Sequence, residues 1–238
     1  MSKTEKFNDY KLGLRRGIPI GLGYVSVSFT FGLLAVNGGI PLWLAVFISL
    51  SNLTGAGQFA AASLMINGTT CMEIALTTLI INLRYTLMSI SLSQKIDQKT
   101  STIKRLILGY GITDEIFTVA SVEPLVLSFY YMIGLITLPL AGWVGGTFLG
   151  GLICSSMPVW LSSAMGIAIY GMFIAIIVPQ MKGSRPVLYI VLLSIVINLF
   201  LYYIPFFNFI SSGFRVIITA LIASAVGALV YPQREEVC

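Results

Sequence analysis

The sequence predicts an all-α protein that crosses a membrane several times. Of its 238 residues, 57% are hydrophobic and only 10% are charged, against about a quarter in a typical soluble domain. The mean hydropathy is +0.93, and apolar stretches continue as far as residue 230. So few polar side chains cannot cover a water-soluble globule. We therefore expect an integral membrane protein rather than a soluble domain with an anchor.

Eight apolar segments are candidates for spanning helices, each of which needs about 20 residues. Short loops connect them, so we expect one membrane domain over residues 1–238. No small-residue cleavage site follows the first apolar run, which argues against a cleaved signal peptide. The candidate segments cover residues 17–37, 41–66, 72–94, 106–123, 125–149, 151–178, 187–204 and 210–230.

Lysine and arginine predict the orientation, because cytoplasmic loops are enriched in them. They cluster in residues 3–16, in residues 95–105 and at residues 182–185. If all eight segments cross, the 95–105 loop falls outside, against this rule. If 41–66 and 151–178 instead enter and leave on one side, six crossings remain, and all three basic regions and both termini are cytoplasmic.

A polar stretch, SNLTGAGQF, lies inside the uncharged segment 41–66. One interpretation is a broken or re-entrant helix with arms of about 10 residues, each rising about 15 Å, half the hydrocarbon thickness. The other is one long tilted helix whose glycines allow close packing. Crossing parity and polarity favour the interrupted helix, whose freed backbone groups would have to be buried in protein or line a watery cavity. The candidate substrate ligands in this stretch are Asn52, Thr54, Gly55, Gly57 and Gln58.

Weak internal similarity predicts two repeat halves, residues 12–105 and 125–238. PLWL at 41–44 recurs as PVWL 117 residues later, and IINL at 80–83 recurs as VINL at 196–199. In the six-crossing arrangement the halves would be inverted, as in many transporters. The first segment of each half also carries glycines at four-residue spacing, which predicts close helix packing. These ridges are Gly13, Gly17 and Gly21, and Gly142, Gly146 and Gly150.

Arg84 is the clearest charged residue within a predicted span, near the middle of 72–94. Charges at this depth are costly and usually face the bundle interior or a transport pathway. Asn82 precedes it by two residues, and we expect both to contribute to a site. Glu73, at the start of the same segment, is expected at the membrane interface.

Asp114 and Glu115 lie midway along the predicted span 106–123. One of these acids can pair with Arg84, which leaves the other for a proton or a substrate amine. A buried acid without a partner takes up protons more readily, so both are candidates for proton coupling. The alternative is that 106–123 lies partly at the interface, with both acids in water.

These residue types suit a small zwitterion. A carboxylate would bind the N-terminal amides of an interrupted helix, an ammonium would bind carbonyl groups or a carboxylate, and an apolar tail would contact surrounding Phe, Leu and Met. Spacing alone does not separate an amino acid from another small zwitterion or ion.

Several classes of function are excluded or disfavoured by composition. The chain has no histidine, which excludes imidazole metal sites, histidine proton relays and Ser–His catalysis. Aspartate occurs only at 9, 97 and 114, so no membrane-embedded pair is available for an aspartyl protease. The three cysteines lack metal-ligand spacing. The basic residues lie between spans and do not form a nucleic-acid surface. We expect no enzyme, no cofactor and no bound metal.

Four motifs, in order, resemble the AzlC family: RRGIPIGLGYVSVSFTFGLLAVNGG, LTGAGQFAAASLM, TTLIINLRYTLMSISLS and GITDEIF. The similarity covers about residues 12–120, and AGQF, NLR and TDE in this order are fairly specific. Many members have histidine after the NLR arginine, where this chain has Tyr85. The match places residues 55–59, 82–84 and 113–115 on the family's motifs.

The resemblance implies the larger subunit of a two-component exporter of branched-chain amino acids in a bacterial inner membrane. It also implies a small, apolar AzlD-like partner and coupling to the proton gradient. The polar stretch at 52–58 would hold the substrate, Asn82 and Arg84 would position its carboxylate or balance charge, and Asp114 or Glu115 would couple protons. A channel, or a scaffold subunit that does not transport, is the alternative.

Overall fold

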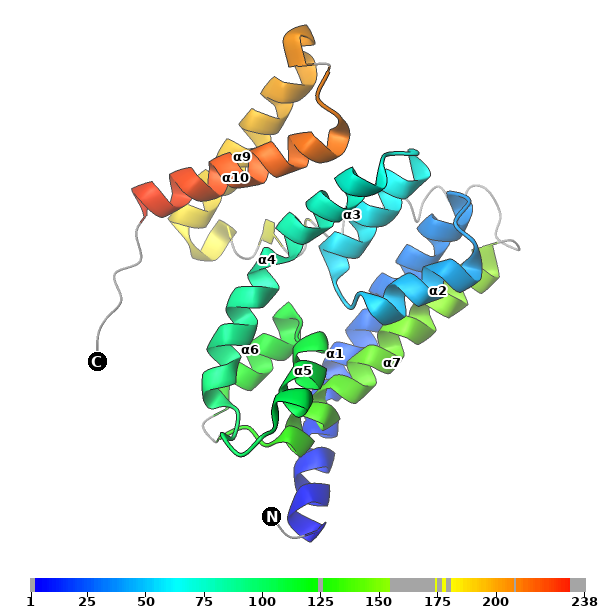
Figure 1. Cartoon of the computed structure of the whole chain (residues 1–238), viewed down its shortest axis with the longest axis vertical. Helices are drawn as coiled ribbons and strands as arrows, with labels where there is room; N and C mark the ends of the chain where they lie inside the picture. The colour runs from blue at the N-terminus through cyan, green and yellow to red at the C-terminus, as the bar shows by residue number, and fades with distance from the viewer. Residues whose placement is uncertain are drawn as a thin grey trace.

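In the computed structural model, the described part of the chain is helical, as predicted, and contains no strand. It comprises residues 3–123, 126–154, 174, 177–178, 181–207 and 209–231. Five of its helices are long and apolar enough to cross a membrane. The elements are α1 (Lys3–Asn37), α2 (Leu42–Ser51), α3 (Gly55–Ile66), α4 (Cys71–Lys95), α5 (Thr102–Tyr110), α6 (Asp114–Val122), α7 (Phe129–Cys154), α9 (Arg185–Tyr203), the short 3₁₀ helix η1 (Pro205–Phe207) and α10 (Ser212–Val230) (Figure 1).

Helices α1 and α7 pack along most of their length through the two predicted glycine ridges. At one end Gly13 lies against the backbone of Tyr131, and towards the other Gly150 lies against the backbone of Phe29. The contact continues beyond the predicted ridges, where Gly32 lies against the backbone of Thr147. A Cβ added at Gly17 would come within 2.7 Å of the Leu135 carbonyl oxygen, so only glycine permits this approach. Because both residue numbers increase in the same direction, the two helices are parallel. The close packing predicted from the ridges is confirmed.

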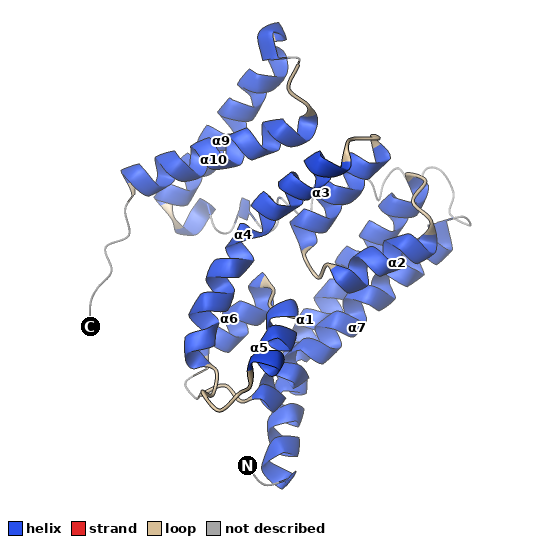
Figure 2. Cartoon of the chain, in the orientation of Figure 1, coloured by secondary structure: helices blue, strands red, loops and turns tan. Residues whose placement is uncertain are grey.

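The segment 41–66 is interrupted where the sequence predicted. Helix α2 ends at Ser51, residues 52–54 are extended or irregular, and α3 begins at Gly55 (Figure 2). The side chain of Ile66, at the end of α3, lies against Gly38, just before α2. The segment therefore returns to the end of the molecule from which it started. The interrupted, re-entrant helix is confirmed, and the single tilted helix is excluded.

The prediction of one span over 106–123 is wrong, because this segment is also interrupted. Helix α5 ends at Tyr110 and α6 begins at Asp114. The flanking segments meet again, since Ile96 pairs with Leu127 through a backbone bridge and the Lys95 ammonium donates to the Ser121 carbonyl. The α5–α6 hairpin thus also returns to its starting end. A threonine followed by two acids is a helix-start signal, and it marked this second interruption.

These two hairpins change the crossing arrangement. The Lys104 ammonium lies over the Phe129 ring, and the Ser128 hydroxyl donates to Asp9, so the basic 95–105 loop lies at the N-terminal end of α1, as the charge pattern predicted. However, the six-crossing arrangement requires 17–37 and 125–149 to run oppositely, and α1 and α7 are parallel. That arrangement, and the inverted relation between these two segments, is therefore wrong. The predicted re-entrance of 151–178 falls largely outside the described residues.

Helices α9 and α10 pack together, and α10 also contacts α4 (Figure 1). The contact between α4 and α10 is organised by Glu73, which was expected at the interface but is only 5% exposed. Its carboxylate accepts hydrogen bonds from the Ser211 hydroxyl at 2.5 Å and from the Gly213 N–H at 2.8 Å. Glu73 of α4 therefore supplies a hydrogen-bond acceptor to groups at the start of α10 that have no partner within their own helix. Its negative charge also interacts favourably with the N-terminal end of the helix dipole.

Removing this carboxylate should loosen α10. We expect Glu73→Ala to lower the free energy of unfolding by about 1–3 kcal/mol, because the buried Gly213 N–H and the partly buried Ser211 hydroxyl lose their acceptor. Thermal unfolding in detergent would measure the change. Glu73→Gln retains one acceptor oxygen and should lose less; equal melting temperatures for wild type and Glu73→Ala would contradict this role.

The two hairpins also predict which loops share a side of the membrane. With the native cysteines replaced by serine, Lys6→Cys and Lys99→Cys should react with an impermeant thiol reagent from one side. Asn37→Cys and Asn67→Cys should react only from the other side. Labelling of Lys99→Cys and Asn37→Cys from the same side of the membrane would contradict the α5–α6 hairpin.

Candidate substrate and coupling site at the two helix interruptions

The two interruptions meet although their hairpins start from opposite ends of α1. The Tyr110 hydroxyl, at the end of α5, donates to the Leu50 carbonyl, near the end of α2. This bond satisfies a backbone acceptor that the interruption leaves without a partner in its own helix. Two irregular backbone segments, with the polar residues that flank them, are thereby brought to one place.

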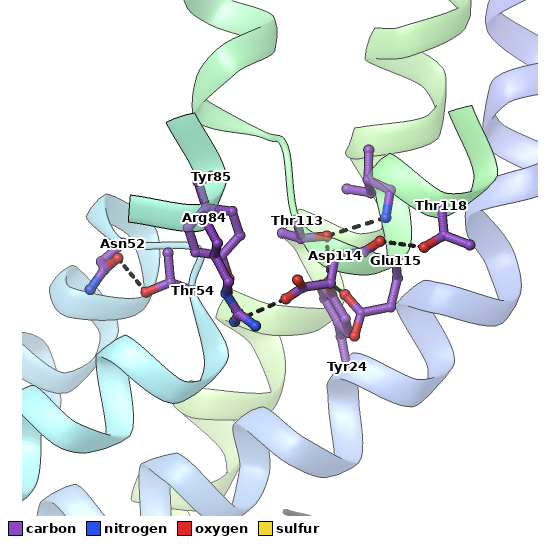
Figure 3. Close-up of polar contacts among 10 residues, drawn as sticks. Tyr24, Asn52, Thr54, Arg84, Tyr85, Thr113, Asp114, Glu115 and Thr118 are labelled. Atoms are coloured by element: carbon purple, nitrogen blue, oxygen red, sulfur yellow. Dashed lines mark hydrogen bonds and ion pairs between the residues drawn. The ribbon is translucent and has the colours of Figure 1, made fainter. Parts of the chain in front are cut away.

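Arg84 and Asp114 form an ion pair across this place, with 2.9 Å between the guanidinium and the carboxylate (Figure 3). Arg84 lies in the middle of α4, and Asp114 is the first residue of α6. The predicted pairing of Arg84 with one of the two acids is confirmed. The side chains are 43% and 39% exposed, so the pair remains accessible. Facing hydrocarbon would be costly for such a pair, which indicates a polar surrounding.

Tyr85 orients the guanidinium. Arg84 donates to the Tyr85 hydroxyl at 3.1 Å, and its guanidinium carbon lies 5.0 Å from the centre of the Tyr85 ring. The hydrogen bond and the cation–π contact both direct Arg84 toward α6. The sequence analysis did not assign a role to Tyr85; its position directly after the arginine was the available signal.

Glu115 has a different partner from its neighbour Asp114. Its carboxylate accepts a 2.5 Å hydrogen bond from the hydroxyl of Tyr24, a buried residue of α1. The Tyr24 hydroxyl also lies 2.6 Å from that of Thr113, which caps α6 by accepting from the Ile116 N–H. The two adjacent acids therefore connect α6 to two different helices, α4 and α1. Tyr24 was not singled out from the sequence, because a tyrosine in an apolar helix is usually a packing residue.

The first interruption presents Asn52 and Thr54 on the other side of Arg84 and Tyr85 in Figure 3. The Thr54 hydroxyl donates to the Asn52 side-chain carbonyl at 2.6 Å, and both residues are half-buried. Gly55 then begins α3, and the N–H groups in the first turn of a helix have no partner within that helix. A helix start at this position is where the sequence analysis predicted that a carboxylate would bind, and that binding stays a prediction.

The other candidate ligands are more deeply placed. The Gln58 side chain is fully buried; it donates to Ser49 at 2.6 Å and accepts from the Trp143 indole at 3.0 Å. Its amide is therefore already occupied, which favours a structural role over direct substrate contact. A Cβ at Gly57 would lie 2.5 Å from the Asn82 side-chain oxygen, so these residues form the contact between α3 and α4. Among the described residues that buried oxygen has no hydrogen-bond partner, so Asn82 retains a free acceptor.

Comparison with known proteins shows a family match that covers the residues of this site. The family model described as "AzlC protein" matches residues 19–157, which include both interruptions and the ion pair. An uncharacterized membrane protein of Archaeoglobus fulgidus is 30% identical over 78% of this chain and 82% of its own length. No solved structure matches the chain.

Two further relatives carry more informative names. The inner membrane protein YgaZ of Escherichia coli is 32% identical over 58% of each chain. The branched-chain amino acid transport protein AzlC of Bacillus subtilis is 25% identical over 71% of this chain and 66% of its own length. The family match covers more than half of the sequence and includes the motifs that form the site. The chain belongs to the AzlC family of membrane proteins.

Proposed function

We propose that this protein is a subunit of a secondary transporter that exports branched-chain or other small apolar amino acids. The observation that carries the proposal is the accessible Arg84–Asp114 pair, held where two re-entrant hairpins meet from opposite ends. A central site flanked by two hairpins suits alternating access, in which either hairpin opens toward its own side. The name of the Bacillus subtilis relative supports the substrate class.

The substrate carboxylate would bind Arg84 and the N–H groups in the first turn of α3, which lack a partner within that helix. Its ammonium would find an acceptor in the free side-chain oxygen of Asn82. Its apolar side chain would contact the surrounding hydrophobic residues. Each charged end of a zwitterion then has a complementary group, as burial of a charge requires.

Proton coupling would follow from competition for Arg84. The substrate carboxylate and the Asp114 carboxylate cannot both occupy the same face of the guanidinium. When the substrate takes Arg84, Asp114 loses its positive partner, and protonation removes the cost of an unpaired charge. Substrate binding and proton binding would then be linked at one residue. Glu115, which is held by Tyr24, would be the second protonatable group.

The complete transporter would lie in a bacterial inner membrane with its N-terminus in the cytoplasm and would include a small AzlD-like subunit. This assignment rests on the family and on the basic residues at the N-terminal end of α1. A channel or a scaffold remains the alternative class. Accumulation of substrate against its concentration gradient separates a transporter from both.

The ion pair should be required for transport itself. We expect Arg84→Ala and Asp114→Asn each to reduce leucine efflux at least about tenfold, which corresponds to about 1.4 kcal/mol of lost stabilisation. Efflux from cells that lack their own exporters, with the partner subunit co-expressed, would measure this. Lys99→Ala, in the 95–105 loop, is the control.

The Arg84→Ala/Asp114→Asn double variant separates a functional role from a structural one. If the residues only neutralise each other, removing both should restore transport, and this result would contradict the proposed site. If Arg84 binds substrate and Asp114 couples protons, the folded double variant should remain inactive.

Glu115→Gln should separate proton coupling from substrate movement. A glutamine cannot gain or lose a proton in the working range, but it keeps an acceptor for Tyr24. In proteoliposomes with the partner subunit, we expect loss of accumulation driven by a pH gradient while leucine exchange at equal concentrations continues. Unchanged pH-driven accumulation would remove Glu115 from the coupling mechanism.

A further inference from the structure

A closed ring of hydrogen bonds joins α2, α3 and α7 beside the first interruption. The Gln58 amide donates to Ser49 at 2.6 Å, and the Ser49 and Thr147 hydroxyls are 2.7 Å apart. Thr147 donates to the Trp143 carbonyl at 3.0 Å, and the Trp143 indole N–H donates back to the Gln58 carbonyl oxygen at 3.0 Å. If Ser49 donates to Thr147, every hydroxyl, amide and indole group in the ring has a partner.

The ring holds both sides of the interruption against one rigid helix. Ser49 lies near the end of α2 and Gln58 lies in the first turns of α3, so residues 50–57 are fixed at both ends. All four side chains are buried. A buried polar network in which every group is satisfied favours one geometry, because any shift leaves a polar group unpaired.

Trp143 also reaches toward the second interruption. Its ring packs edge-to-face against Tyr24, with 5.1 Å between ring centres, and Leu53 of the first interruption packs in the same cluster. The Tyr24 hydroxyl in turn donates to Glu115 of α6. Packing and hydrogen bonds thus connect Glu115 to Gln58 through two aromatic side chains from α1 and α7.

We propose that Trp143 is a positioning residue that couples the two interruptions, transmitting changes at Glu115 through Tyr24 to Gln58 and the start of α3. The coupling deepens the transport mechanism and rests on the proposed function. When Glu115 is neutral, it attracts the Tyr24 hydroxyl less strongly. The ring of Tyr24 then shifts against the indole, and the bond from Trp143 to Gln58 changes with it.

Other charged and titratable groups lie near Glu115, and their effects must be separated from that of Glu115 itself. Tyr85 of α4 and the neighbouring Asp114 interact electrostatically with Glu115, and Arg84 is bound to Asp114. Tyr85 and Arg84 belong to α4, and Asp114 is paired with that helix through Arg84. A signal that reaches Trp143 through Tyr24 should therefore depend on Glu115 and not on Asp114.

The first experiment measures the coupling without any substrate. In a variant with Trp43→Phe and Trp160→Phe, Trp143 is the sole tryptophan and its emission reports on its surroundings. Glu115→Gln should shift the emission maximum by several nanometres, whereas Asp114→Asn should not. In a Tyr24→Phe background, Glu115→Gln should produce no further shift. Absence of a shift, or an equal shift in the Tyr24→Phe background, would overturn the proposal.

The second experiment separates positioning from simple packing. Trp143→Phe keeps an aromatic ring beside position 24 but leaves the Gln58 carbonyl oxygen unpaired. It should lower both the melting temperature and leucine efflux, whereas Trp43→Phe, on an exposed tryptophan, should lower neither. Adding Gln58→Met to Trp143→Phe removes the unpaired group and should restore the melting temperature.

The double variant gives the decisive result. If Trp143 couples the interruptions, efflux by Trp143→Phe/Gln58→Met stays low despite recovered stability. If Trp143 only fills space, efflux recovers with stability, and the proposal is overturned. The fluorescence measurement needs no substrate, so it tests the coupling independently of transport. If the protein transports no amino acid but shows the expected emission shifts, the proposed function is refuted and the proposed coupling stands.

Discussion

The structure depends on one constraint: backbone groups that leave helical hydrogen bonding within a bilayer must be satisfied by protein. Two hairpins break their helices at mid-length, and each break is supplied with partners. Tyr110 binds the Leu50 carbonyl, and Thr113 caps the start of α6. With these partners in place, the free-energy cost of irregular backbone at that depth is reduced. The irregular backbone in turn creates the polar environment in which Arg84 and Asp114 are held.

The glycine ridges determine how closely the supporting helices approach. Because α1 and α7 contact each other through backbone, Tyr24 of α1 and Trp143 of α7 come within packing distance. From there Tyr24 reaches Glu115 on one hairpin, and Trp143 reaches Gln58 on the other. The parallel pair is therefore more than a scaffold, since its aromatic residues join two hairpins that enter from opposite ends.

Part of the site followed from local sequence. A polar stretch without charges inside an apolar segment indicated the first interruption, and an arginine in the middle of a span needed an acidic partner, which the structure identifies as Asp114. The basic loop at 95–105 was also placed correctly relative to the N-terminus. The second interruption was missed because the length and hydropathy of 106–123 resemble those of a spanning helix, although the Thr113 cap signal was present.

The sequence by itself determined the membrane class, the family, the position of the first interruption and the charged residues of the site. These are local properties, because an apolar run, a helix cap or a charge within an apolar segment can be recognised within one continuous stretch of sequence. Only the tertiary structure decided the pairing of Tyr24 with Glu115 and of Gln58 with Trp143, in each of which the two residues are 85 or more apart in sequence. Such pairings depend on how parallel helices and opposed hairpins pack, which no short stretch of sequence specifies.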